Sequence, residues 1–89
     1  MKIDTKREAL PIDTLATIKA LNHCVGQEVH YIVFQDVMAW KGGDRMKCGE
    51  SLERVKQLFP LAFEWVIDAA PGRTAWVRIA VRKKIAGFE

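Results

Sequence analysis

The sequence predicts an α+β domain: a four-stranded antiparallel sheet with two helices on one face, in the order α-β-β-α-β-β. Residues near 13–25 and 51–59 repeat apolar side chains at helical spacing. Residues 28–41 are rich in β-branched and aromatic side chains, and residues 74–84 alternate between an apolar face and a face rich in cations. If both helices cover the same face of the sheet, its other face is open.

The size and composition of the chain are those of one globular domain, residues 1–89. Of its 89 residues, 49% are hydrophobic and 28% are charged, which is unlike the composition of a disordered chain. No apolar run approaches the roughly 20 residues that span a bilayer, and the first residues do not resemble a signal peptide. We therefore expect a cytoplasmic protein that does not act at a membrane. Residues 1–9 show no periodicity and are expected to form a flexible arm or an edge strand.

Two helices are expected from their start and stop signals. Asp13 is a suitable N-cap for the first, and Gly26 suits the position just past its end. Ser51 is the expected N-cap of the second, which Pro60 ends. The apolar stripes at helical spacing are Leu15, Ile18, Leu21 and Val25 in the first helix, and Leu52, Val55, Leu58 and Phe59 in the second.

Residues 28–41 are expected to be strand, either one long bent strand or two short ones. Gly42 and Gly43 would then form a two-residue hairpin loop, because both residues accept a positive φ. In this hairpin Trp40 lies opposite Arg45.

The last two strands, residues 63–68 and 74–84, are expected to form a second hairpin. A loop with an even number of residues would set core side chains of one strand against polar side chains of the other. The odd loop 69–73 avoids this conflict and places Val77 opposite Trp65.

The cations are concentrated near the C-terminus, where five of the fourteen Lys and Arg residues follow Gly72. Together with the first hairpin, they place basic and aromatic side chains on the open sheet face. Such a face is typical of binding to single-stranded nucleic acid, because bases stack on rings while Arg and Lys contact phosphates. We therefore predict a small, non-enzymatic nucleic-acid-binding protein. Its predicted binding residues are Trp40, Arg45, Lys47, Trp76, Arg78, Arg82 and Lys84.

The same face has two other interpretations. In one it is a solvated sheet face, on which the stems of Arg and Lys shield the tryptophans. In the other it binds a protein partner or a second copy of the chain, which would make the protein a regulator, an inhibitor or a homodimer. The apolar side chains with the same outward parity are Ile32, Phe34, Met38 and Val66.

Cys24 and Cys48 are expected to be reduced, buried thiols, because a small secreted domain usually has more disulfides. His23 and His30 are also zinc-ligand types, but no pair of these residues has the close spacing of a structural zinc site. Cys48, His30 and Asp36 can be drawn as a nucleophile, a base and an orienting group, although nothing in their spacing supports this. We therefore predict no metal, no cofactor and no catalytic residue.

Overall fold

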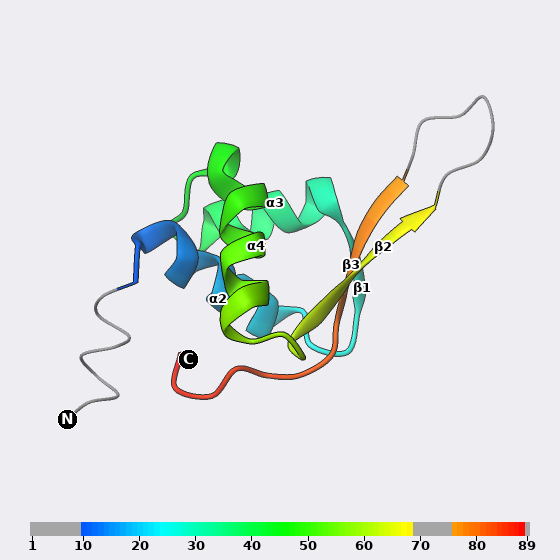
Figure 1. The fold of residues 1–89 in the computed structure, drawn as a ribbon. Helices are drawn as coiled ribbons and strands as arrows, with labels where there is room; N and C mark the ends of the chain where they lie inside the picture. The colour runs from blue at the N-terminus through cyan, green and yellow to red at the C-terminus, as the bar shows by residue number, and fades with distance from the viewer. Residues whose placement is uncertain (1–9, 69–75, 89) are drawn as a thin grey trace.

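The computed structural model describes residues 10–68 and 76–88, which form an α+β fold with three helices and a three-stranded antiparallel sheet (Figure 1). The prediction of four strands and two helices is therefore wrong. In chain order the elements are α2 (Ile12–His23), β1 (Glu28–His30), α3 (Tyr31–Trp40), the 3-10 turn η1 (Arg45–Lys47), α4 (Cys48–Leu58), β2 (Phe63–Asp68) and β3 (Trp76–Val81). Residues 1–9, expected to form an arm or an edge strand, lie outside the described residues.

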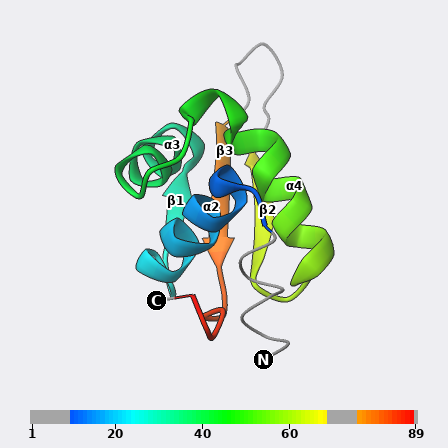
Figure 2. The same ribbon diagram turned by 90° about the vertical axis from the view of Figure 1, so that its left-hand side faces the viewer.

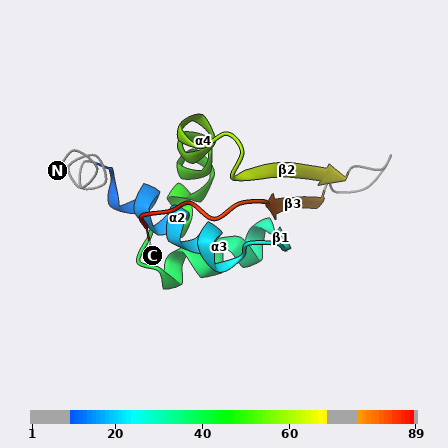
Figure 3. The same ribbon diagram turned by 90° about the horizontal axis from the view of Figure 1, so that it is seen from below.

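The sheet has the strand order β1-β3-β2, and β3 runs antiparallel to both of its neighbours. Figure 2 shows α2 in front of β3, with α3 on the side of β1 and α4 on the side of β2. Seen from below, α4 again lies next to β2 (Figure 3). The hairpin of β2 and β3 extends past the helices (Figure 1). Helix α2 is thus the centre of a helical layer that covers one face of the sheet.

Helix α2 confirms the first predicted helix, although its start differs. Pro11 occupies the N-cap position, and Asp13 lies in the first turn. The carboxylate of Asp13 does not cap the helix but accepts a hydrogen bond from the backbone N–H of Asp44, at 2.8 Å. Because α2 lies between α3 and α4, with β3 behind it, it is buried on more than one side (Figure 2). Its buried residues are Thr14, Ala16, Thr17, Ile18, Ala20 and Leu21.

The segment predicted as the first long strand is mostly helical. Only Glu28–His30 forms a strand, and Tyr31–Trp40 forms α3. The prediction relied on β-branched propensity, which side-chain packing overrides. Phe34 and Met38 are one helical turn apart, and both are fully buried. A helix therefore buries both of these large side chains on one face.

The two glycines predicted to close a hairpin instead end α3. Gly42 has a φ of +101°, and its N–H donates to the carbonyl of Ala39. The N–H of Gly43 donates to the carbonyl of Met38, which completes the Schellman pattern of a helix C-terminus. Gly43 also lacks room for a side chain, because a Cβ there would lie 2.8 Å from the Cβ of Ala16. The predicted first hairpin is therefore replaced by a helix and its cap.

Helix α4 begins before the predicted N-cap, so that Ser51 lies buried inside the helix. The preceding turn η1 is capped by Asp44, whose carboxylate accepts a hydrogen bond from the N–H of Met46 at 2.9 Å. The helix ends at Leu58, shortly before Pro60, as predicted. Its buried residues are Cys48, Ser51, Leu52 and Val55.

The hairpin of β2 and β3 confirms the predicted faces but not the predicted register. Val77 pairs with Ile67 rather than with Trp65, and Trp65 pairs with Ile79. This shift of two residues leaves each side chain on its predicted side of the sheet, because side chains alternate with a period of two. The described part of the last strand is Trp76–Val81, so it ends before the predicted residue 84, and its predicted start at residue 74 lies outside the described residues.

We expect Ile79→Ala to lower the free energy of unfolding by about 2–5 kcal/mol. Ile79 has no exposed surface and lies on the central strand. Ile67→Ala is the matched control, because Ile67 lies on the same side of the sheet but is 62% exposed and should cost less than about 1 kcal/mol. Urea unfolding measures both losses, and equal losses would contradict the assignment of the core face.

We expect Gly43→Ala to lower the free energy of unfolding by about 1–3 kcal/mol, because the new methyl group overpacks the contact between α3 and α2. Gly42→Ala tests the other half of the cap. A Cβ added at Gly42 would meet no other atom, but the φ of this residue is positive. A positive φ costs an alanine about 1–2 kcal/mol. Thermal and urea unfolding measure both effects. A fully stable Gly43→Ala variant would show that this residue faces solvent, as it does in a hairpin loop.

Candidate functional site

The structure places the predicted binding residues in three separate regions rather than on one sheet face. Arg78 and Arg82 lie on the outer side of the sheet, Arg45 and Lys47 lie in η1, and Trp40 and Lys84 lie beside the C-terminal end of α2. Trp76 belongs to β3, but its side chain lies outside the part of the chain that the structure describes.

The two arginines on the outer side of the sheet are paired with carboxylates. The guanidinium group of Arg78 forms an ion pair with Asp68 and lies 3.7 Å from the carboxylate of Glu28. Arg82 lies 3.3 Å from the carboxylate of Glu64. Each acid belongs to a strand next to β3, so the pairs connect the strands. The three carboxylates outnumber the two guanidinium groups, and the arginines therefore add no excess positive charge to this side.

The two cations of η1 also have acidic neighbours. Arg45 forms an ion pair with Asp36 of α3, and the ammonium group of Lys47 lies 3.6 Å from the carboxylate of Glu50. All four side chains are at least half exposed. Such surface pairs contribute only about 0–1 kcal/mol, so these side chains can exchange their partners for a ligand at little cost.

Trp40 and Lys84 line an open pocket of about 560 Å³ between the ends of α2 and α3 and the C-terminal segment. Lys19 and His23 of α2 line the same pocket, as does Lys41, which follows Trp40. The structure thus brings together only two of the predicted residues in a cavity, and it adds further cations to them.

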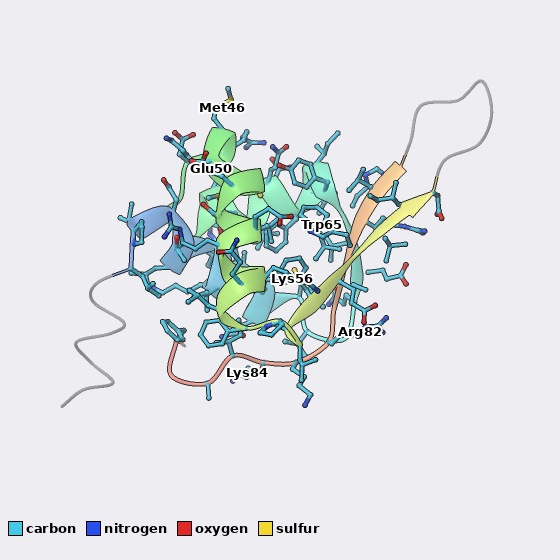
Figure 4. All side chains as sticks on the ribbon, in the orientation of Figure 1. Met46, Glu50, Lys56, Trp65, Arg82 and Lys84 are labelled. Carbon is cyan, nitrogen blue, oxygen red and sulfur yellow. The ribbon has the colours of Figure 1, made fainter. Side chains whose placement is uncertain are left out.

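The exposed surface of α4 carries a second group of polar side chains. Lys47, Glu50, Arg54 and Gln57 recur at spacings of three and four residues, which places them along one side of the helix. Figure 4 shows Glu50 near the start of α4, far from Lys84. The start of α4 and the pocket therefore lie in different parts of the molecule.

Two side-chain contacts hold α4 against the hairpin. The indole N–H of Trp65 donates to the carboxylate of Glu53 at 3.0 Å. The ammonium group of Lys56 donates to the carbonyl of Phe63 at 2.5 Å and lies 5.1 Å from the centre of its ring. Figure 4 shows Trp65 and Lys56 between the helix and the strand. These contacts fix the direction of α4 relative to β2.

The predicted binding residues include neither Lys19 and Lys41 of the pocket nor Glu50, Arg54 and Gln57 of α4. The exposure of Arg54 and Gln57 could have been predicted, because both lie on the polar face of the second predicted helix. The proximity of Lys19 and Lys41 could not, because it depends on α3, which the sequence analysis assigned to strand.

Both cysteines are free and buried, as predicted. Burial raises the pKa of the Cys48 thiol to about 11, while a hydrogen bond with Tyr31 acts in the opposite direction. Burial also raises the pKa of Cys24, against the attraction of the nearby Lys41. Cys48 is therefore a neutral thiol near pH 7, the form with low nucleophilicity.

Within residues 10–68 and 76–88, no three His, Cys, Asp or Glu side chains are grouped as metal ligands would be. In the same part of the chain, no helix is long and apolar enough to cross a membrane. Comparisons with protein families, with curated proteins and with solved structures find no significant match for this chain. The function therefore has to be inferred from the geometry of the described residues.

We expect stability to fall between pH 9 and pH 11, because the unfolded Cys48 loses its proton near pH 9.0 and the folded one near pH 11. In this window the native state binds more protons, so raising the pH favours unfolding. The two pKa values imply a loss of about 3 kcal/mol from this residue. Cys48→Ser is the control, since serine does not titrate there. Urea unfolding at pH 8, 9.5 and 11 should show a smaller loss for the variant, and equal losses would contradict the assignment.

Proposed function

We propose that this chain is a cytoplasmic, non-enzymatic DNA-binding domain whose helix α4 enters the major groove of duplex DNA. The order of elements carries the proposal: the helix pair α3 and α4 is followed by a β-hairpin that belongs to the same small sheet. This arrangement resembles winged helix-turn-helix domains, in which the second helix of the pair lies in the major groove. A fold alone does not determine a function, so the proposal of DNA binding also depends on the exposed side chains of α4.

The surface in this proposal differs from the sheet face that the sequence analysis predicted. Trp40 and Lys47 belong to no strand, and Arg78 and Arg82 are paired with carboxylates. The described part of the outer side of the sheet thus lacks Trp40, and its arginines do not supply the excess positive charge that a single strand of nucleic acid requires. We therefore propose a duplex rather than a single strand as the ligand.

The exposed side chains of α4 are of the types that read base edges. Arg54 suits the two acceptors of guanine, Gln57 suits adenine, and Glu50 can accept a hydrogen bond from cytosine. A helix is about 10–12 Å wide with its side chains, and the major groove is about 12 Å wide. Because the opposite face of α4 is buried in the core, the helix presents these side chains without deforming the domain.

The mixed charge of this surface indicates what kind of DNA binding to expect. Lys47 and Arg54 are offset by Glu50 and Glu53 on the same helix and its start. Non-specific binding depends on many uncompensated phosphate contacts, which this helix does not offer. Affinity should therefore come mainly from base contacts at a preferred sequence.

The alternative, a protein partner or a second copy of the chain, has one observation in its favour. Helix α3 exposes two neighbouring apolar side chains, Ile32 at 62% and Val33 at 51%. Adjacent apolar side chains on a surface are typical of interfaces. Light scattering during the DNA experiment distinguishes this case, because a protein interface would yield a stable dimer without DNA.

We expect selection from a randomised duplex pool to enrich a short sequence motif. Arg54→Ala should weaken binding to the enriched duplex by about 1–3 kcal/mol, because one bidentate base contact is lost. Fluorescence anisotropy with the labelled duplex, over a salt series, measures this change. If Arg54 instead contacts a phosphate, all sequences lose affinity alike and the log–log salt slope falls by about 0.9.

Arg82→Ala is the matched control, because it removes the same charge from the outer side of the sheet. It should change the affinity by less than about twofold, as expected for a charge far from the contact. Equal losses of affinity in Arg54→Ala and Arg82→Ala would show that the DNA does not bind through α4. A pool that yields no enrichment, together with no duplex binding at micromolar protein in low salt, would remove DNA as the ligand.

A further inference from the structure

We infer that a groove at the C-terminal end of α4 binds a small carboxylic acid with an apolar body, of the medium-chain fatty acid class. The groove lies between residues 58–62, from the last residue of α4 to the start of β2, and residues 83–86, which follow β3. Its volume of about 480 Å³ lies within the usual range of ligand sites. Figure 4 shows Lys84 near this end of α4 and Glu50 near the other end. None of the side chains proposed to contact DNA bases lines the groove.

The lining of the groove is mainly apolar. Seven of its nine residues have apolar side chains, and the other two are Lys83 and Lys84. Ala62 and Ile85 are buried, whereas Leu58 is 40% exposed and Leu61 is 71% exposed. A ligand with an apolar body would remove the surface of both leucines from water. Such burial is the main source of affinity in ligand pockets, so the groove suits an apolar ligand.

Both walls of the groove are held in place by hydrogen bonds within the chain. The carbonyl of Ala62 accepts hydrogen bonds from the N–H of Arg82 at 2.7 Å and from the N–H of Lys83 at 3.2 Å. The side-chain amide of Asn22 donates to the carbonyl of Ile85 at 2.9 Å and accepts from its N–H at 2.7 Å. The groove is therefore formed before a ligand arrives, which reduces the entropy cost of binding.

The carboxylate of the ligand is inferred from Lys83, an exposed residue that lines the groove. Among the described residues that line the groove, none is an aspartate or a glutamate. The ion pairs between described residues do not include Lys83. Lys84 has another interaction, so we assign the contact to Lys83 alone. One ammonium group beside an apolar groove suits one carboxylate, with which it forms a charge-assisted hydrogen bond.

The extent of the apolar surface favours a small molecule over a protein partner. A stable protein interface buries at least about 1,000 Å² and contains several large apolar anchors. Within the part of the chain that the structure describes, the only large and exposed apolar side chains in the groove are Leu58 and Leu61. Other exposed apolar side chains, such as Ile32 of α3, lie outside the groove. A ligand with one short apolar chain matches a surface of this size.

The experiment is an NMR titration of the isotope-labelled full chain with octanoate, 1-octanol and acetate, which separate the carboxylate from the apolar chain. Octanoate should bind at least about 10-fold more tightly than acetate, because acetate lacks the apolar chain. It should bind about 2–5-fold more tightly than octanol, as expected for one exposed ion pair. The backbone amide signals that shift most should belong to residues 58–62 and 83–86.

Two variants test the two parts of the ligand separately. Lys83→Ala should remove the preference for octanoate over octanol and leave the affinity for octanol unchanged. Leu61→Ala should weaken the binding of both ligands by about 3-fold or more. Lys19→Ala and Ile67→Ala are the matched controls, because each removes an exposed side chain of the same kind that does not line the groove. They should change both affinities by less than about twofold.

Four outcomes would overturn the inference. Equal affinities for octanoate and acetate, or no shifts at about 1 mM octanoate, would show that the apolar chain is not bound. Equal losses in Lys83→Ala and Lys19→Ala would show that the acid is attracted by net charge alone. Shifts of the groove residues that depend on protein concentration in the absence of ligand would assign the groove to a second copy of the chain.

The same variants separate the groove from the proposed function. Neither Lys83→Ala nor Leu61→Ala should change the affinity for the enriched duplex, because neither residue belongs to α4. Binding of octanoate and binding of DNA can therefore each fail without the other.

Discussion

The reversal of the chain at Gly42 and Gly43 is the constraint on which the positions of α3 and α4 depend. Gly43 packs against Ala16 so closely that no side chain fits, which brings the end of α3 against α2. The hydrogen bond from Asp44 to Asp13 then holds the next residues at the start of α2. This reversal leaves the last residues of α3 beside the end of α2, where they line the pocket, and it directs the chain into α4 on the other side.

The predictable part of the fold is the part in which local pattern and packing agree. In β3 the alternation of side chains in the sequence predicts that Ile79 points inward, and Ile79 is buried in the structure. Helix α2 likewise forms where apolar residues recur at helical spacing. In α3 the two signals conflict: Ile32 and Val33 favour a strand, although they end up exposed. The helical spacing of Phe34 and Met38 decides the outcome, because these side chains fill the core.

The candidate site was harder to predict, because a sequence does not show which carboxylates lie next to its cations. Arg78 has Asp68 and Glu28 beside it only because β1 and β2 flank the same strand. The basic stripe visible in the sequence therefore becomes a set of ion pairs. Lys19 and Lys41 show the opposite effect. Nothing in the sequence connects these two lysines, but the packing of α2 and α3 places both of them beside one pocket.

The distribution of charge limits how α4 can recognise DNA. The whole chain carries a formal charge of only +3, so its field beyond the Debye length of about 8 Å is weak. On α4 the charges alternate in sign, and recognition there has to come from short hydrogen bonds to base edges. Shape and hydrogen bonding would therefore decide which DNA sequence α4 binds.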